Sequence, residues 1–371
     1  MLILVLVIIV GVTGVLAWQQ FHQPEKAIAG SMSVIDDLGR NVTITEYPPK
    51  RIVSLAPSCT EILFALGLGD KVVGVDAFSD YPPEVQERVR SGNLTVVGSF
   101  GAAFNVEKIM SLEPDLILAT GGIQRLIGII EKLEGLGLPI VTLYPIKLEG
   151  VLADISLVGK IAGEEERAEE LVLNMKEKIQ EIAAKMQNVP KPRVYIEYFF
   201  DGGYWSYGSG SFANELVSMA GGVNVFAGFA GQYLSTSTEE VLKANPEVII
   251  IARGSMAEAC GLSPEVIKDR PGWNETYAVQ NDHICQINED IVSREGPRIV
   301  EGLEELAKII HPELFEKETG IAAQKSREAA TTQASGGDIR YSPIGDTTRP
   351  PHAGSYICCR CASGVQLKHE I

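Results

Sequence analysis

The sequence is poor in positive charge, and this shortage excludes one large class of partner. Its 371 residues include 32 lysines and arginines against 48 aspartates and glutamates, so the formal net charge is −16. Binding to nucleic acid needs a positive surface, because the charge of the phosphate backbone must be neutralised. The composition therefore argues against a nucleic-acid-binding protein.

Short catalytic motifs are also missing. The sequence has no phosphate-binding loop, no G-x-S-x-G nucleophile elbow and no H-E-x-x-H zinc helix, and its 5 histidines are scattered. Residues 208–213 fit the pattern G-x-G-x-x-A, yet no acidic residue follows at the distance that would hold a ribose. We interpret this segment as a glycine-rich turn that opens a helix. The sequence predicts no enzyme, no cofactor and no metal ligands.

Cysteine, at 6 residues, is too scarce for a disulfide framework in a chain of this length. Cys59, Cys260 and Cys285 each stand alone among apolar or turn residues, where a small buried hydrophobic side chain is the common arrangement. A bridge between Cys260 and Cys285 is an alternative in an exported protein. The three cysteines near the C-terminus lack the paired C-x-x-C spacing of a zinc site.

The two ends of the chain differ from its body. Residues 1–17 contain no charged side chain, and this length lies between that of a signal peptide core and that of a spanning helix. We predict that residues 1–33 are a signal peptide or an N-terminal membrane anchor, which places the body in the periplasm or at the cell surface. Residues 317–371 are rich in small and polar residues without periodicity, and we predict a disordered tail.

Short apolar runs rich in β-branched residues recur through the body, with helical patterns between them. Continuous apolar strands that alternate with helices are typical of parallel sheets in α/β proteins. We therefore predict an α/β fold with mainly parallel sheets. The expected strands are residues 52–55, 72–75, 116–119, 140–143, 194–196, 248–251 and 284–287.

One expected helix stands apart by its length. Across residues 164–187 apolar side chains recur at spacings of three and four, which predicts a helix about 36 Å long with one apolar face. Its position midway between two α/β halves predicts two lobes joined by one rigid helix, although a surface helix of one large domain is the alternative. The expected parts are an N-terminal lobe at 34–162, the interlobe helix at 163–192 and a C-terminal lobe at 193–316.

The two halves contain similar segments. TEILFALG at 60–67 resembles NELVSMAG at 214–221, and LEPDLILA at 112–119 resembles ANPEVIIIA at 244–252. These pairs occur in the same order in both halves. The pattern indicates one lobe plan that is used twice.

Two glutamates, Glu61 and Glu215, occupy matching places in this repeat. Ser58 and Glu61 fit a capping box, with Ser58 as N-cap and Glu61 at position N3. Counted from Ser211 as N-cap, Glu215 falls at N4, outside such a box. Two glutamates at equivalent places on two lobes can instead dock arginines of a two-fold symmetric partner. The residues alone leave both roles open.

Aromatic side chains gather in segments that follow the expected strands. The groups are Phe78 with Tyr81, Phe100 with Phe104, and a cluster within 198–207 that includes Phe200, Tyr204 and Trp205. Such rings suit a broad, mostly apolar ligand that is held by stacking and released unchanged. Roughly half are expected in the core, and strand alternation makes Tyr195 and Phe199 the first candidates.

Several ordered segments carry a family resemblance. Among them are RIVSLAPSCTEILFALGLGDKVVGV from Arg51, SDYP at 79–82, LEPDLILA at 112–119, GSFANELVSMAGGVNVFA at 210–227 and REGPRIVEGLEELA at 294–307. With them, residues 34–316 resemble the periplasmic binding proteins for metal chelates, which deliver cobalamin, ferric siderophores or haem to ABC importers. The resemblance implies two lobes on one rigid helix with the ligand in the cleft between them. It also implies that Glu61 and Glu215 meet arginines of an ABC permease dimer, whose ATPase subunits are separate chains.

The residues also favour one ligand class within that family. An arginine such as Arg253 or Arg294 suits an anionic chelate, whereas the aromatic cluster suits a large uncharged macrocycle and the acidic body repels anions. We expect a corrinoid such as cobalamin, with a ferric siderophore as the alternative and haem third because no axial ligand stands out. A sensor module or an exported enzyme is the alternative from another class. The expected ligand contacts are Pro57, Phe78, Tyr81, Phe100, Phe200, Tyr204, Trp205, Arg253 and Arg294.

Overall fold

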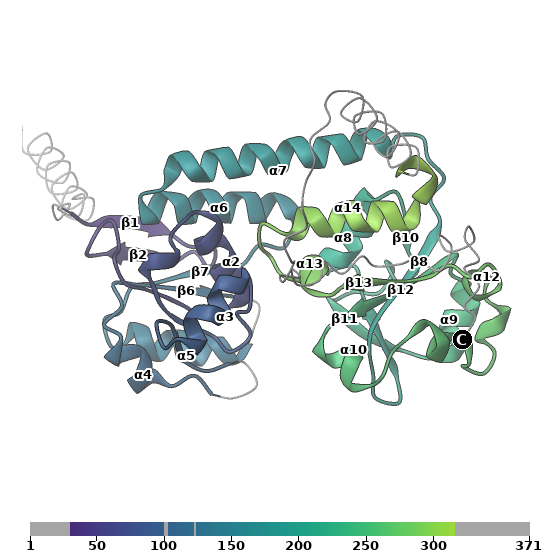
Figure 1. Ribbon diagram of the computed structural model, residues 1–371, viewed down its shortest axis with the longest axis horizontal. Coiled ribbons are helices and arrows are strands. Elements are labelled where there is room, and N and C mark those ends of the chain that lie inside the picture. The colour runs from purple at the N-terminus through teal and green to yellow at the C-terminus, as the bar shows by residue number, and fades with distance from the viewer. Residues whose placement is uncertain (1–29, 100–102, 122–123, 316–371) are drawn as a thin grey trace, which may run out of the picture. The chain divides into compact units, whose positions relative to one another are not determined.

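The structure is a computed structural model that describes residues 30–99, 103–121 and 124–315 (Figure 1). These residues divide into two compact units. The first runs to Leu63 and adds Gly67–Leu143 and Val158–Glu165, and the second holds Phe64–Leu66, Tyr144–Leu157 and the chain from Glu166 onward. Each unit has its own sheet with helices packed on it, so the predicted two-lobe α/β fold is confirmed.

The first unit is built on a five-stranded sheet in which every neighbouring pair is parallel. Its order is β5 (Thr95–Val96), β4 (Val72–Val75), β3 (Ile52–Ser54), β6 (Leu116–Thr120) and β7 (Ile140–Leu143). The inner strands are buried on both faces, which explains their unbroken runs of Val, Ile and Leu. All four strands predicted for this half are present.

Helices connect these strands, and an antiparallel hairpin precedes them. The hairpin is β1 (Met32–Ile35) with β2 (Asn41–Ile44). The helices are α2 (Pro57–Ala65), η1 (Gly69–Lys71), α3 (Pro83–Arg90), α4 (Val106–Ser111) and α5 (Gln124–Glu134). The core between sheet and helices is almost wholly aliphatic, with Ile109, Ile117 and Leu133 fully buried and Phe104 as its one aromatic member among the described residues.

The second unit combines parallel and antiparallel strands. Parallel pairing joins β8 (Arg193–Phe200) to β10 (Val223–Asn224) and to β12 (Val248–Arg253), and joins β12 to β13 (Ile284–Asn288). Antiparallel pairing adds β9 (Tyr204–Tyr207) to β8 and β11 (Tyr233–Thr236) to β9. The three strands predicted here are present, whereas the antiparallel extension was not predicted.

The helices of this unit are mostly short. They are α8 (Phe212–Met219), α9 (Thr238–Ala244), α10 (Ser255–Ala259), α11 (Pro264–Lys268), η2 (Trp273–Glu275), α12 (Tyr277–Gln280), α13 (Asp290–Ser293) and α14 (Ile299–Ile310). The core contains three large aromatic side chains, Tyr195, Phe226 and Trp273, beside aliphatic residues such as Ile249. Tyr195 makes edge contacts with both Phe226 and Trp273.

A β-bulge changes which aromatics of β8 are buried. The register with β9 shifts between Glu197 and Phe199, so Tyr198 is an extra residue in the strand. Tyr195 is fully buried as predicted. The same prediction for Phe199 is wrong in part, because the bulge buries Tyr198 and leaves Phe199 only half-buried.

The chain passes between the units through α6 (Leu148–Ala162) and α7 (Glu165–Lys185). The 21 residues of α7 lie within the predicted long helix, and its apolar face buries Ala168, Val172, Met175 and Ile182. Nearly all of α7 is in the second unit, where Lys178 pairs with Glu304 of α14. The joining role of this helix and the predicted lobe boundaries stay predictions.

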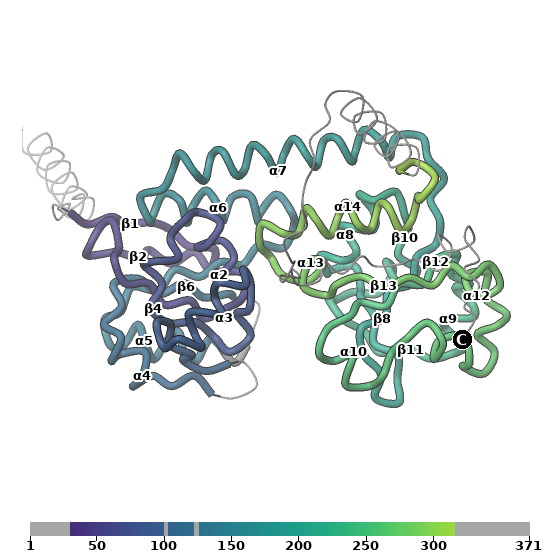
Figure 2. The backbone as a smooth tube through the Cα atoms, viewed as in Figure 1, coloured from purple at the N-terminus to yellow at the C-terminus, as the bar shows by residue number. Residues whose placement is uncertain are grey.

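The repeated lobe plan is visible in the topology, and the tube in Figure 2 traces it in each unit. In the first unit β3, α2 and β4 are followed by α4, β6 and β7; in the second, β8, α8 and β10 are followed by α9, β12 and β13. Strands β3 and β8 both pair with the parallel strand that follows their helix and with the strand after α4 or α9. The similar segments seen in the sequence therefore occupy equivalent places.

The predicted terminal segments lie almost wholly outside the described residues, which include only 30–33 of the signal or anchor and none of the tail. Within the described ranges, no helix combines the length and the apolar character that a membrane span requires.

Candidate functional site

Loops at the carboxyl ends of parallel strands carry most of the predicted site residues, as is usual in α/β proteins. In the first unit, Pro57 follows β3 and opens α2, where a proline fits because the first helical N–H has no partner. Phe78 and Tyr81 follow β4, and their side chains are 48% and 39% exposed. Both rings are thus available to a ligand. Phe100 lies outside the described residues, and Phe104 is a core residue.

A buried chain of hydroxyl groups holds the loop that carries Phe78. Thr60 of α2 donates to Ser54 at 2.8 Å and lies 2.7 Å from the Ser79 hydroxyl. Ser79 donates to the buried Asp76 carboxylate, which also accepts the Phe78 N–H at 2.9 Å. These bonds fix the start of the loop to the end of β3, so the exposed ring projects from a rigid base.

In the second unit, the hairpin of β8 and β9 presents the predicted aromatic group. Phe200 ends β8 with 38% of its surface exposed, and its ring stacks on Tyr204 with centroids 5.3 Å apart. Trp205 is half-buried and donates its indole N–H to Asp201 at 2.9 Å. Tyr204 also lies edge-on to the buried Trp273. The structure brings Phe200, Tyr204 and Trp205 together, as predicted.

The two predicted arginines lie at the same edge of this sheet, but each has an acidic partner. Arg253 ends β12 and pairs with Glu258 at 3.4 Å. Arg294 follows α13 and pairs with Asp290 at 2.8 Å, with only 15% of its side chain exposed. Each arginine therefore already has a carboxylate partner within the second unit.

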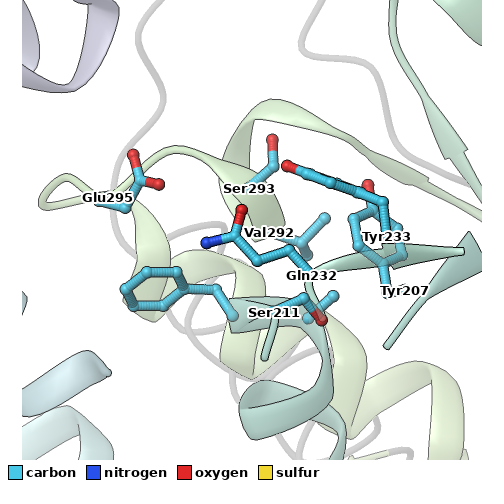
Figure 3. Close-up of a pocket in the computed structure, with 9 residues that line it drawn as sticks. Tyr207, Ser211, Gln232, Tyr233, Val292, Ser293 and Glu295 are labelled. Atoms are coloured by element: carbon cyan, nitrogen blue, oxygen red, sulfur yellow. The ribbon is translucent and has the colours of Figure 1, made fainter. Parts of the chain in front are cut away.

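A pocket of the second unit lies beside the start of α8 (Figure 3). In this view Glu295 lies on one side of Gln232, and Tyr207 and Tyr233 lie on the other. The lining residues are Tyr207, Ser211, Phe212, Ala213, Gln232, Tyr233, Val292, Ser293 and Glu295. The buried Tyr207 hydroxyl has no hydrogen-bond partner among the described residues. The lining offers neutral polar groups and one acid, and no basic side chain.

The acids beside this pocket titrate near neutral pH. Burial, and then the neighbouring Asp290, raise the pKa of Glu289 to about 7, although Arg294 opposes the shift. Burial raises the pKa of Glu295 to about 7 as well. Burial also raises the pKa of Tyr207, and the charge of Glu289 adds to this effect. This region favours neutral or cationic groups over anions.

The chain matches the family of periplasmic binding proteins over residues 52–291. It belongs to that family. An ABC transporter substrate-binding lipoprotein of Bacillus subtilis, YvrC, is 34% identical over 288 residues, which cover 76% of this chain and 87% of the relative. The fold described above is therefore that of a substrate-binding protein.

Two further proteins that resemble this chain have names that state a ligand. The vitamin B12-binding protein of Vibrio cholerae is 31% identical over 268 residues, 70% of this chain and 88% of the relative. A crystal structure of that protein matches with a TM-score of 0.61 over 71% of this chain and 97% of the other. A possible iron-binding protein of Staphylococcus epidermidis is 30% identical, with a TM-score of 0.61 over 71% of this chain and 99% of the other.

Glu61 and Glu215, the two glutamates predicted to dock on a permease, are both at least partly shielded from solvent in the structure. The capping-box prediction for Glu61 is wrong, because α2 begins at Pro57 and puts Ser58 inside the helix. Glu61 is buried, with 4% of its surface exposed. Glu215 is half-buried and accepts the Leu148 N–H at the start of α6, at 2.8 Å. No contact in the structure tests docking, so the docking role of Glu61 and Glu215 stays a prediction.

A second pair of equivalent glutamates is exposed. Glu107 stands in the first turn of α4, which Asn105 caps by accepting the Lys108 N–H at 2.8 Å. Glu239 stands in the first turn of α9, which Ser237 and Glu240 open with a capping box. The two helices precede the similar segments at 112–119 and 244–252. Glu107 and Glu239 are therefore exposed at equivalent places on the two units.

The remaining sequence predictions have mixed outcomes. The segment 208–213 is a turn that leads into α8, and Ser211 caps the helix by accepting the Asn214 N–H at 3.1 Å, as interpreted. Cys59 is buried, and Cys260 is a free thiol rather than the partner of Cys285. Among the described residues, no group of His, Cys, Asp and Glu has the arrangement of a metal site.

The sequence reading did not single out Glu295 and Tyr233 of the pocket or Glu289 beside it, although Tyr207 falls in the predicted aromatic cluster at 198–207. Glu289 and Glu295 follow β13 at the carboxyl edge of the sheet, and this position after an expected strand was a usable signal. Tyr233 could not be placed, because it comes to Tyr207 only through the antiparallel pairing of β11 with β9. Glu197, a lone acid inside an apolar strand, was a second missed signal.

Proposed function

We propose that the protein is an extracytoplasmic substrate-binding protein that captures a corrinoid, such as cobalamin, and delivers it to an ABC importer. The observation that carries the proposal is the aromatic hairpin of β8 and β9, where Phe200 stacks on Tyr204 and keeps 38% of its surface exposed. Such a surface suits the broad face of a macrocycle. Similarity to the vitamin B12-binding protein of Vibrio cholerae supports the same ligand.

The charges of the second unit favour this ligand over an anion. Arg253 and Arg294 each pair with an acid, and the pocket beside α8 has no basic lining residue. A net charge of −16 further disfavours anionic ligands at long range. Corrinoids such as cobalamin carry neutral carboxamide arms, and these match the hydroxyl and amide groups of Tyr207 and Gln232 better than a carboxylate would.

Equilibrium titration tests the ligand. The purified protein is titrated with cyanocobalamin, with ferrichrome as a ferric hydroxamate and with haemin, while tryptophan fluorescence is recorded. Trp205 lies on the aromatic hairpin, so a ligand held there quenches its emission. We expect saturable one-to-one quenching by cyanocobalamin. Saturation by ferrichrome or haemin alone would replace the corrinoid with that ligand.

A ferric siderophore is the second candidate, and it has its own support. The possible iron-binding protein of Staphylococcus epidermidis matches this chain as well as the vitamin B12-binding protein does. The arginines decide between the two ligands. If ferrichrome binds, Arg253→Ala weakens its binding, because it removes a guanidinium at the end of β12 that can donate to the hydroxamate oxygens; if cyanocobalamin binds, the same variant has little effect.

The proposed partner is an ABC permease dimer with separate ATPase subunits. Docking needs one accessible carboxylate on each unit, and two pairs compete for the role: the predicted Glu61 with Glu215, and the exposed Glu107 with Glu239. We favour the exposed pair, since a permease arginine can reach it without opening the fold.

Uptake of labelled cyanocobalamin by cells that use this protein separates the two pairs. The double variant Glu107→Gln with Glu239→Gln is expected to lose uptake and keep ligand affinity. The double variant Glu61→Gln with Glu215→Gln is the matched control and is expected to keep both. The reverse result would restore the pair predicted from the sequence.

The same assays address the other class of function. A sensor module would bind the ligand but support no uptake with any permease. An exported enzyme would return a chemically changed corrinoid. We expect the ligand to be recovered unchanged after release, which absorbance spectra and mass spectrometry of the released fraction measure.

A further inference from the structure

A buried ion pair, Glu197 with Arg270, contacts the aromatic rings of the β8–β9 hairpin. Glu197 sits in the middle of β8 and is fully buried. Both of its carboxylate oxygens accept hydrogen bonds from Arg270, each at 2.7 Å, and the Arg270 side chain is only 9% exposed. Arg270 lies between α11 and η2, so the pair joins two segments that are 73 residues apart.

The planar guanidinium of Arg270 also contacts three aromatic rings. Its central carbon lies 4.3 Å from the ring centroid of Tyr204, 4.6 Å from that of Trp273 and 5.5 Å from that of Phe200. Phe200 and Tyr204 belong to the hairpin, while Trp273 belongs to the core beneath it. The Arg270 guanidinium therefore contacts two rings of the hairpin and one buried ring of the core.

The surroundings keep this cation charged. Burial alone would lower the pKa of Arg270, but the hydrogen bonds and the charge of Glu197 raise it overall. Tyr195 completes the cluster by donating its hydroxyl to Glu197 at 2.9 Å. Burial, followed by the Glu197 charge, raises the pKa of that tyrosine well above its usual value, so it stays a donor.

Stability alone does not explain such a pair. Replacing a buried ion pair by neutral side chains of similar size is often neutral or even stabilising, because desolvation offsets the attraction. A cation over an aromatic face, by contrast, fixes the position of the ring. A flat guanidinium can hold several rings at once, which a lysine ammonium cannot.

We propose that the Glu197–Arg270 pair is a positioning device that holds the aromatic hairpin ready for its ligand. Glu197 fixes the orientation of the guanidinium, the guanidinium fixes Tyr204 and Phe200, and the hairpin then carries Trp205 with it. Binding is stronger because the rings are ordered before the ligand arrives. The ligand part of this inference rests on the proposed function; the ordering of the hairpin does not.

Two variants separate positioning from stability. Arg270→Met leaves Glu197 as a buried unpaired charge, so it is expected to lower both the melting temperature and the affinity for cyanocobalamin. Adding Glu197→Gln removes that charge, and the melting temperature is expected to recover. The affinity of the double variant is expected to stay about tenfold weaker than that of the wild type, because the cation over the rings is still missing. Recovery of affinity together with stability would overturn the proposal.

A matched control lies on the same strand. Arg193 at the start of β8 pairs with Glu247 at 3.2 Å, but that pair is solvent-exposed and contacts no hairpin ring in the described structure. Arg193→Met combined with Glu247→Gln is expected to leave cyanocobalamin affinity unchanged. Arg270→Lys keeps a charge without the planar fork and is expected to behave like the double variant. Wild-type affinity in Arg270→Lys would contradict the role given to the guanidinium.

A readout without ligand keeps the test independent of the proposed function. The Trp205 indole N–H bonds to Asp201, and Trp205 is not one of the three rings that the Arg270 guanidinium contacts. In 15N-labelled protein its signal is expected to broaden and to exchange faster with solvent in the Arg270 variants, and not in the Arg193 control. An unchanged Trp205 signal would refute the positioning role. If the wild type binds no cyanocobalamin, the proposed function fails and this signal still decides the inference.

Discussion

The two units repeat one topology and differ in what they build on it. The first has a five-stranded parallel sheet and an aliphatic core, whereas the second adds the antiparallel strands β9 and β11 and buries Tyr195, Phe226 and Trp273. Helices α2 and α8, and helices α4 and α9, stand at equivalent places. The comparison teaches that the shared plan supplies the scaffold and that the antiparallel hairpin, where we propose the recognition surface, is an addition of the second unit.

Each unit also contains an acid–arginine pair whose carboxylate is fully buried, and the two pairs make different contacts. In the first unit Asp36 pairs with Arg40 four residues away and accepts the Thr142 N–H at 3.1 Å, which ties the β1–β2 hairpin to β7. In the second unit Glu197 pairs with Arg270 across the fold and beneath aromatic rings. The first pair closes a hairpin onto a sheet, and the second contacts the rings of the proposed ligand surface.

The largest expected effect is on the aromatic core. Trp273→Ala removes a fully buried ring that contacts Tyr195, Tyr204 and Arg270, so we expect a loss of ~3–5 kcal/mol in the free energy of unfolding. Chemical denaturation measures it. Leu133→Ala in the first core is expected to cost ~2–4 kcal/mol. Only the Trp273 variant should broaden the NMR signal of the Trp205 indole N–H. Equal broadening in both variants would show that the core of the second unit has no special role in ordering the hairpin.

Next in size is the pH dependence of the second unit. Glu289 and Glu295 have folded pKa values of about 7, above the ordinary value of 4.5. Their protonated forms favour folding, so this stability is fully present below pH 4.5 and is lost as the pH rises through 7. The contribution is at most ~3 kcal/mol for each group.

Thermal unfolding between pH 5 and pH 8 checks this dependence. Glu289→Gln should flatten the curve, because the amide cannot ionise. A wild-type curve that rises towards pH 8 would contradict the raised pKa values.

A smaller effect is expected from the first unit's ion pair. Asp36→Asn removes the charge that Arg40 neutralises and leaves an amide in a site of backbone N–H donors, including that of Arg40 at 2.9 Å. We expect a loss of about 2 kcal/mol in the free energy of unfolding. Cyanocobalamin affinity should not change. A binding defect as large as that of the Arg270 variants would mean that both pairs serve recognition.

The smallest effect concerns the equivalent helices. Asn105→Ala and Ser237→Ala each remove the N-cap of a short helix, α4 or α9, and each is expected to cost about 1 kcal/mol. Ser237 takes part in a two-sided capping box, so its loss should be slightly the larger. Denaturation curves measure both variants. A loss of unfolding free energy in only one of the two variants would show that the two caps do not contribute equally to stability.

Sequence reading succeeded where the signal is local. Continuous apolar runs predicted seven of the described strands, because a parallel strand buried on both faces leaves no polar positions. The similar segments in the two halves marked the repeated topology correctly, and the composition of 198–207 marked the aromatic cluster, although not the hairpin that carries it. These features depend on neighbours in the chain.

It failed where distant segments decide the outcome. The burial of Phe199 depends on a bulge against β9, and the role of Glu215 depends on the start of α6. Arg270 showed no signal of its own, since its partner Glu197 comes from another segment. The exposure of Glu107 and Glu239 depends on how α4 and α9 pack in the fold.

One measurement tests most directly the claim that the hairpin of the second unit recognises the ligand. Isothermal titration with cyanocobalamin compares the wild type with Phe200→Ala and with Tyr277→Ala, a control whose ring in the same unit is 48% exposed. The account predicts one-to-one binding by the wild type, an affinity about tenfold weaker in Phe200→Ala and no change in Tyr277→Ala. No binding by the wild type, or equal affinity in all three proteins, would contradict it.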